Sequence, residues 1–377
     1  MRKIGILTFH WADDYGAMLQ AYGLKAFLET QGCTSEILPY APLKCTGRYW
    51  LFPYILKINN AGKRELAFRQ ITYRLQKNIR MLPIFLQRKK NMRWFRRNYL
   101  TKATAIRTVE KLSCKEYECI LVGSDQVWNP ELTLGLDDAY LGKIKKEECR
   151  FIAYAASFGG AALPNAYAGE LQKAFEENFA AISLREQGAV PYVQSLTAKT
   201  IDCTLDPTLL LPKVEWEKVA KQSKERNYIL VYNTAANEEV FEYAYRLAKE
   251  KNCRVIRISS FLNRLPKKYS CFENNLVAGP AEFLGLFAGA DYVVTNSFHG
   301  TVFSVIFEKK FVVFGYAGRS LRITDFLKKM KLEQHFIENL NQPVVETIDW
   351  NSVKEALEKE RKASVNFLRQ NILRKGN

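Results

Sequence analysis

Short apolar runs, each stopping abruptly at glycine or polar residues, alternate with helical patterns along most of this 377-residue chain. The clearest runs occupy residues 3–8, 119–122, 151–155 and 181–184 in the first half and 228–232, 254–258, 292–295 and 311–314 in the second. Such runs are typical of strands buried on both faces of a parallel sheet. The helical patterns between them predict an α/β fold made of two doubly wound, Rossmann-like domains.

The length of the chain exceeds what one hydrophobic core usually organises, which also favours two domains. Pro207 and Pro212 lie where the first alternation ends, and prolines of this kind mark a transition between domains. We predict an N-terminal α/β domain over 1–215 and a C-terminal α/β domain over 216–377 that ends in a charged helix. Open α/β sheets bind ligands beyond the carboxyl ends of their strands, so we expect the site in a cleft between the two domains.

A strongly basic segment interrupts the first domain. Residues 57–107 hold fifteen lysines or arginines and the single acid Glu65. We predict a basic helical insertion over about 44–110. Aromatic residues flanked by these cations suit an interfacial helix, so an anionic membrane surface is one partner predicted for 50–107. A nucleotide-linked acceptor, or a solvated helix pair with no partner, explains the same charge; nucleic acid is not expected, because no recognised binding module accompanies it.

The remaining composition argues against several classes of protein. No apolar stretch near the N-terminus resembles a signal peptide, and no uncharged run is long enough to cross a bilayer. We therefore expect a cytoplasmic protein, with peripheral contact at the inner face of the cell membrane as the alternative. The eight cysteines are scattered and only three histidines accompany them, so neither a metal nor an organic cofactor is expected.

Four motifs follow the predicted strands in a fixed order. They are the G-S-D-Q-V-W-N block at 123–129, the S-L-R-E block at 183–186, the Asp206-Pro207 pair and the S-F-H-G block at 297–300. Over about residues 1–335 the chain thereby resembles the polysaccharide pyruvyltransferase family. The resemblance implies a GT-B-like fold. It also implies transfer of pyruvate from phosphoenolpyruvate to two hydroxyls of a lipid-linked or nucleotide-linked saccharide, forming a cyclic ketal in polysaccharide biosynthesis.

The donor chemistry sets requirements that particular residues meet. Phosphoenolpyruvate carries a phosphate and a carboxylate, so its site needs cations and helix N-termini. Its methylene carbon must accept a proton, and a base must take the proton of the hydroxyl. His299 is the candidate for proton transfer, because imidazole titrates near neutrality and this one opens a helix. Arg185 matches the family's arginine after its central strand; the alternatives are a helix-capping role for His299 and an ion pair between Arg185 and Glu186 or another acid.

The other expected site residues fall into two sets. Donor contacts are expected from Asn296, Ser297, Gly300, Arg322 and Arg319. Some relatives carry an arginine where this chain has Ser297, and Arg322 or Arg319 would replace that charge. Acceptor contacts are expected from His10, Asp13, Asp14, Tyr15, Gly16, Gln20, Ser124, Asp125, Gln126, Trp128 and Asn129. We expect Trp128 to stack on a sugar ring and His10 to act as a second acid or base, while local stabilisation of the loops is the alternative.

Two other functions compete with this one. A GT-B-type glycosyltransferase that uses a nucleotide sugar would share the two-domain fold and differ in its donor. A non-enzymatic polysaccharide-assembly protein would keep the fold and would not depend on His299.

Overall fold

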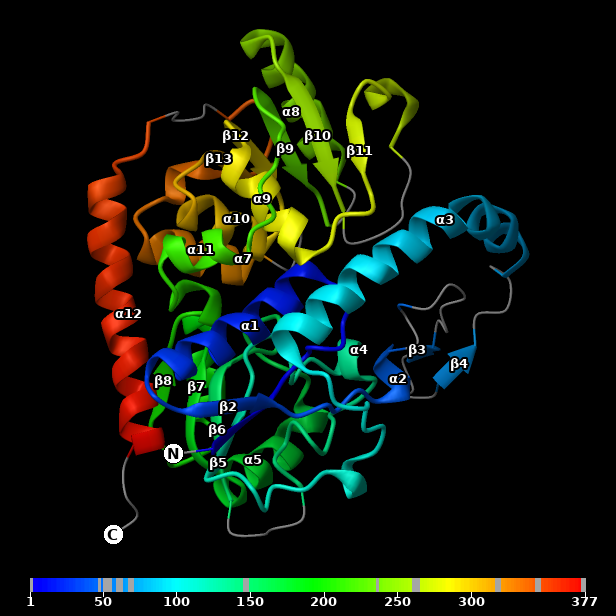
Figure 1. The fold of residues 1–377 in the computed structure, drawn as a ribbon. Coiled ribbons are helices and arrows are strands. Elements are labelled where there is room, and N and C mark those ends of the chain that lie inside the picture. The colour runs from blue at the N-terminus through cyan, green and yellow to red at the C-terminus, as the bar shows by residue number, and fades with distance from the viewer. Residues whose placement is uncertain are drawn as a thin grey trace. The chain divides into compact units, whose positions relative to one another are not determined.

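The computed structural model describes residues 3–46, 49, 56–58, 64–66, 71–144, 149–234, 237–259, 265–315, 320–342 and 347–373. The chain forms two compact units (Figure 1). Unit 1 comprises Met1–Pro207 together with Phe367–Asn377, and unit 2 comprises Thr208–Asn366. The structure thus divides the chain a few residues before the predicted boundary at 215, and it returns the end of the chain to the first unit.

Unit 1 contains a six-stranded parallel sheet in the order β2-β1-β5-β6-β7-β8. Its strands are β1 (Lys3–Leu7), β2 (Thr34–Ile37), β5 (Cys119–Val122), β6 (Arg150–Ala156), β7 (Phe179–Leu184) and β8 (Ile201–Cys203). Its helices include α1 (Tyr15–Thr30), α2 (Leu43–Thr46), α4 (Pro130–Thr133), α5 (Ala168–Glu177) and α6 (Val190–Gln194). From β1 the chain continues to β2 at one edge of the sheet, and from β5 it continues through β6 and β7 to β8 at the other edge. Because parallel crossovers are right-handed, α1 and α5 cover opposite faces, as a doubly wound fold requires.

Unit 2 repeats this architecture with the strand order β11-β10-β9-β12-β13-β14, again all parallel. Its strands are β9 (Tyr228–Tyr232), β10 (Arg254–Ile258), β11 (Glu273–Asn275), β12 (Tyr292–Thr295), β13 (Lys310–Phe314) and β14 (Phe336–Ile337). Its helices are α7 (Lys213–Val219), α8 (Glu238–Lys251), α9 (Pro280–Gly289), α10 (Phe298–Ile306), α11 (Leu321–Lys329) and most of α12 (Trp350–Leu373). The two parallel sheets confirm the predicted class of two Rossmann-like α/β units.

The insertion differs from the all-helical segment predicted for 44–110. It contains an antiparallel pair, β3 (Leu56–Ile58) and β4 (Arg64–Leu66), before the long helix α3 (Ile71–Phe95), the π-helical turn η3 (Arg96–Leu100) and the 3₁₀ turn η4 (Val109–Lys111). Segments as short as 56–58 and 64–66 do not by themselves distinguish strand from helix, so the sequence analysis predicted helices throughout the insertion. The predictions made for 47–48, 50–55, 59–63 and 67–70 lie outside the described residues.

The end of α12 contributes to the core of unit 1. Phe367, Leu368 and Ile372 are buried, and the Phe367 ring lies 6.2 Å from that of Tyr154 on β6. The sequence analysis assigned the whole terminal helix to the second domain, because a charged helix carries no sign of which core it joins. Among the described helices, none combines the length and the apolar character needed to cross a bilayer.

Candidate functional site

Each sheet has one point where the chain reverses its direction of progress. In unit 1 this point lies between β1 and β5, and in unit 2 it lies between β9 and β12. Ligands of open α/β sheets bind outside the carboxyl ends of the strands at such a point. Most of the predicted site residues lie in the loops that follow β1, β5 and β12, so the topology gathers them at two switch points, one in each unit.

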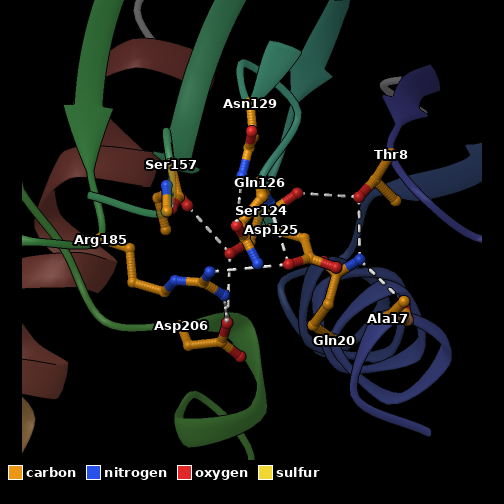
Figure 2. Close-up of polar contacts among 12 residues, drawn as sticks. Thr8, Ala17, Gln20, Ser124, Asp125, Gln126, Asn129, Ser157, Arg185 and Asp206 are labelled. Carbon is orange, nitrogen blue, oxygen red and sulfur yellow. Dashed lines mark hydrogen bonds and ion pairs between the residues drawn. The ribbon is translucent and has the colours of Figure 1, made fainter. Parts of the chain in front are cut away.

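In unit 1, hydrogen bonds join the loops that follow β1 and β5 (Figure 2). The Thr8 hydroxyl donates to the Ser124 carbonyl at 2.9 Å. The Gln20 amide, on α1, donates to Thr8 Oγ1 at 2.8 Å and to the Ala17 carbonyl at 2.9 Å. Gln20 is fully buried. It therefore fastens α1 to the two loops, which is the stabilising alternative to the acceptor contact predicted for it.

Arg185, at the end of β7, lies among carboxylates of its own unit (Figure 2). Its Nη1 is 2.9 Å from Asp206 Oδ2, its Nη2 is 3.6 Å from Asp125 Oδ1 and its Nε is 3.9 Å from Glu186 Oε1. Burial lowers the pKa of the guanidinium, but the charges of Glu186, Asp206 and Asp125 outweigh it and raise that pKa above its ordinary value. Only 6% of Arg185 is exposed. Its observed partners are thus internal acids, which was the alternative to a donor contact.

The same network holds the loop that begins at Gly123. The Ser124 hydroxyl donates to the Ala155 carbonyl at 2.9 Å and lies 3.2 Å from Asp206 Oδ2. Gly123 has φ of +113°, and a Cβ there would meet the Tyr154 carbonyl oxygen at 2.5 Å. Glycine is required at this position, since any side chain would collide with the β6 backbone. Sequence reasoning named Asp206 only as part of a motif; the structure makes it a central partner of this loop.

Trp128 requires a correction. It is fully buried, its indole Nε1 donates to the Tyr140 carbonyl at 2.9 Å, and its ring lies 4.9 Å from the ring of Phe175. An indole in this environment cannot stack on a sugar. The aromatic residue in the loop motif instead anchors the loop to the hydrophobic core of unit 1.

Gln126 and Asn129 interact mainly with each other. Asn129 donates from Nδ2 to Gln126 Oε1 at 2.8 Å, and its own Oδ1 accepts from the Glu131 amide at 3.0 Å as the N-cap of α4. Asp125 adopts a positive φ of 74° between them, a conformation that aspartate tolerates better than most residues. This loop is built largely by its own side chains, and Gln126 and Asn129 are its half-buried polar members.

The structure also contradicts the role predicted for His10. Its side chain is buried, and Nδ1 lies 3.2 Å from the Thr8 carbonyl oxygen. Burial, with a smaller contribution from the charge of Arg96, lowers the pKa of His10 to about 3. The imidazole is neutral near physiological pH and is a poor proton donor there, which contradicts the predicted role as a second acid or base.

The rest of the loop after β1 is held by the insertion and by α1. Asp13 forms ion pairs with Lys89 of α3 and, at 2.9 Å, with Arg96 of η3. Asp14 is the N-cap of α1 and accepts from the Ala17 amide at 3.1 Å. Tyr15 and Gly16 are buried in the first turn of α1, and the Arg88 guanidinium lies 5.2 Å from the Tyr15 ring centroid. Of the acceptor set around α1, Asp14 is the half-buried member that remains within reach of solvent.

In unit 2, the S-F-H-G motif forms the start of α10. Ser297 is its N-cap and accepts from the Gly300 amide at 3.3 Å. His299 lies in the first turn, is 8% exposed, and has its ring 5.2 Å from that of Phe298 in an edge-on arrangement. The positive end of the helix dipole therefore lies at the carboxyl end of β12, beside the predicted proton-transfer residue.

Asparagine side chains bridge the switch point of unit 2. Asn296 Oδ1 accepts from the Thr234 amide at 2.8 Å, and its Nδ2 donates to Asn233 Oδ1 at 2.9 Å. Asn233 Oδ1 also accepts from the amide of Asn237, the N-cap of α8, at 3.1 Å. Sequence reasoning missed Asn233 and Thr234, although their place directly after the apolar run 228–232 was a usable signal.

The remaining residues predicted to contact the donor lie in different environments. A Cβ at Gly300 would lie 2.4 Å from Thr295 Oγ1, so close packing against β12 is enough to require glycine there. The Arg322 guanidinium, in the first turn of α11, lies 6.0 Å from the Phe298 ring centroid, so Phe298 contacts both Arg322 and His299. Arg319 lies outside the described residues. Across the described ranges, no three His, Cys, Asp or Glu side chains come close enough together to hold a metal ion.

Comparisons with known proteins give a family and several distant structures. A family model described as polysaccharide pyruvyl transferase matches residues 14–318. Among solved structures, the chain is similar to S. aureus MnaA with UDP at 11% identity and a TM-score of 0.47, over 95% of this chain and 87% of that one. It is similar to E. coli heptosyltransferase WaaC with ADP at 11% identity and a TM-score of 0.41, over 95% and 99%. No curated protein matches.

Proposed function

This chain belongs to the polysaccharide pyruvyl transferase family, and from that membership we propose that it transfers pyruvate from phosphoenolpyruvate to two hydroxyls of a saccharide. In the proposed reaction the methylene carbon of the donor gains a proton and becomes a methyl group. Two hydroxyl oxygens bond to the adjacent carbon, which forms a cyclic ketal, and the bond from that carbon to the phosphate oxygen breaks. Of the two protons that the hydroxyls lose, one balances the proton gained by the methylene carbon and the other leaves with the phosphate. We further propose that the reaction occurs in the cytoplasm, where a lipid-linked or nucleotide-linked saccharide is the acceptor.

The observation that supports this proposal most strongly is the position of His299. Its imidazole lies in the first turn of α10, at the switch point of unit 2, where a bound anion would meet the positive end of the helix dipole. Arg322 contacts the same Phe298 ring and supplies a cation close to that helix start. We propose that His299 transfers the proton and that Arg322 binds an anionic group of the donor.

The acceptor side is proposed for unit 1. There hydrogen bonds and an ion pair of Gln20, Arg185 and Asp206 hold the loops after β1 and β5 in a defined arrangement. Asp14, Gln126 and Asn129 are the half-buried acceptor candidates, and the others are buried. Arg185 acts in this proposal as a positioning residue, because three carboxylates of its own unit surround it.

The test is an assay of the purified full chain with phosphoenolpyruvate and a panel of lipid-linked and nucleotide-linked saccharides. We expect phosphate release matched by a product whose mass shows the added pyruvyl ketal. His299→Gln should lower the turnover number about 100-fold or more without lowering Tm. Arg322→Gln should raise KM for phosphoenolpyruvate, whereas the matched control Lys328→Gln, an exposed cation on the same helix α11, should leave both constants unchanged.

The competing functions predict other results. A glycosyltransferase would release nucleotide from a nucleotide sugar and leave phosphoenolpyruvate unused. For a non-enzymatic assembly protein, cells carrying His299→Gln would keep the normal modification of their polysaccharide. Either finding, obtained with folded protein, would refute the proposed reaction.

A further inference from the structure

Helix α3 and the segment that follows it, up to Lys102, expose a face that combines cations with large apolar side chains. We call it the basic-aromatic face and define it as Leu86, Lys90, Arg93, Trp94, Arg97 and Lys102. A shallow groove of about 910 Å³ runs along these residues. In Figure 1 the helix that carries the face is drawn in cyan.

The two sides of α3 have different environments. Arg88, Met92 and Phe95 are buried against unit 1, and they recur at the spacing of one helix face. On the opposite side, Leu86 is 56% exposed and Trp94 is 52% exposed. Large apolar side chains that share one exposed surface with cations are typical of a helix lying at a membrane interface.

Among the described residues, no acid compensates the charge of this face. The sequence contains no acid between Glu65 and Glu110. Lys89, which also lines the groove, and Arg96 form ion pairs with Asp13 and are therefore not counted in the face. By contrast, the four cations of the basic-aromatic face have no ion-pair partner within the part of the chain that the structure describes. A concentration of cations of this kind attracts a negatively charged partner.

The shape of the face favours an extended partner over a small anion. The helical stretch from Leu86 to Arg97 rises about 16 Å along one helix side at the usual 1.5 Å per residue. Lys102 follows on the same strip of chain. A single phosphate would need donors that converge from several elements, whereas this groove is lined by residues of one continuous segment, 85–102.

We propose that the basic-aromatic face docks on a bilayer of anionic phospholipids. Trp94 and Leu86 enter the headgroup region, and Lys90, Arg93, Arg97 and Lys102 lie against the lipid phosphates. The proposal concerns where the protein works. It rests on the surface of residues 86–102 alone, so it can fail or succeed independently of the donor chemistry at His299.

The experiment measures partition of the full chain onto vesicles of phosphatidylcholine mixed with phosphatidylglycerol, with pure phosphatidylcholine as the neutral comparison. The wild type should bind the anionic vesicles and release as salt rises. Lys90→Gln/Arg93→Gln/Arg97→Gln should weaken this binding about 100-fold at low salt, because each cation near an anionic surface contributes about 1 kcal/mol, which is roughly a factor of five. Trp94→Ala should weaken it as well and should reduce the part that survives high salt.

The matched control removes the same charge elsewhere. Lys173→Gln/Lys359→Gln/Lys362→Gln changes three exposed, helix-borne lysines, none with an ion-pair partner in the described structure, and should leave vesicle binding intact. Equal weakening by both triple variants would overturn the proposal, because net charge alone would then explain the binding. The proposal would also be overturned if the wild type did not bind anionic vesicles. The same holds if it bound inorganic diphosphate at this face and did not bind vesicles. Phosphate release from phosphoenolpyruvate with a soluble acceptor reports separately on the reaction.

Discussion

At the scale of single residues, the polar side chains that follow the strands are largely partners of one another. Arg185 shows this most clearly, because Asp206, Asp125 and Glu186 surround it in an almost solvent-free setting. Removing one member of such a buried set usually costs several kcal/mol, since it leaves an uncompensated charge. The network therefore gives the loop after β5 one defined conformation, which a binding surface requires.

His10 leads to a prediction about pH. Its pKa is about 3 in the folded chain, because of burial first and the charge of Arg96 second, and about 6.5 when the chain is unfolded. Between these values the unfolded chain binds a proton that the folded chain does not, so this group lowers stability as the pH falls below about 6.5. Above that pH it has no such effect. For each pH unit below about 6.5, this residue lowers the free energy of unfolding by at most about 1.4 kcal/mol.

The variant His10→Asn keeps a donor for the Thr8 carbonyl and removes the titration. We expect its Tm to fall less than that of the wild type when the pH is lowered from about 7 to about 5. His335, whose pKa burial also lowers, remains in both proteins and provides the common background. Two Tm curves that stay parallel over this range would contradict the neutral, buried state of His10.

The sequence predicted which loops hold the candidate residues better than it predicted the directions of their side chains. The loops after apolar runs were identified correctly because the carboxyl ends of parallel strands must meet at one edge of the sheet. Whether a loop side chain points outward depends on tertiary partners. Trp128 and Gln20 therefore appeared to be ligand contacts, although Phe175 packs against the first and Thr8 binds the second.

At the scale of elements, helix α3 and the turn η3 hold the loop after β1 in place. Arg96 donates from Nε to the His10 carbonyl at 3.0 Å and from Nη2 to the Trp11 carbonyl at 3.0 Å and to Asp13 Oδ1 at 2.9 Å. One guanidinium thus binds three residues of a loop that contains no strand or helix. The basic insertion has a structural role in addition to any partner that it binds.

We predict that Arg96→Met loosens this loop. Loss of three charge-assisted hydrogen bonds should lower the free energy of unfolding by about 2–4 kcal/mol and increase amide exchange in residues 9–13, while the strands of unit 2 keep their protection. The neighbouring Arg97→Met is the control, because Arg97 is exposed and makes no such bonds with the described residues. Similar exchange in the two variants would show that Arg96 does not hold the loop.

The elements that sequence reasoning missed are the short ones at the edges. Strands β8, β11 and β14 close the outer ends of the two sheets, and β11 (Glu273–Asn275) contains no apolar residue at all. An edge strand is recognised by its backbone pairing, which hydrophobic periodicity does not report. The central strands were predictable because burial on both faces demands uninterrupted apolar runs.

At the scale of the whole molecule, the chain builds a sheet of six parallel strands twice, with a different strand order in each unit, and the end of α12 then belongs to unit 1 again. The repetition was visible as a second run of alternating strands and helices. The sequence did not indicate that the end of α12 belongs to unit 1. Phe367, Leu368 and Ile372 have the same spacing in a helix whichever core they pack into. The first unit is therefore completed only by the last residues of the chain.

This arrangement makes removal of the C-terminus a selective perturbation. A chain that ends at Asn366 lacks Phe367, Leu368 and Ile372, and burial of each such side chain contributes about 1.5–3 kcal/mol. We expect faster amide exchange in β6, where Tyr154 loses its Phe367 contact, and little change in β9 and β12. A chain that ends at Leu373 retains all three side chains and should behave like the wild type. Uniform loss of protection in both sheets would show that residues 367–373 stabilise the whole molecule and not the first unit, whereas the observed packing makes the β6 region the first to respond.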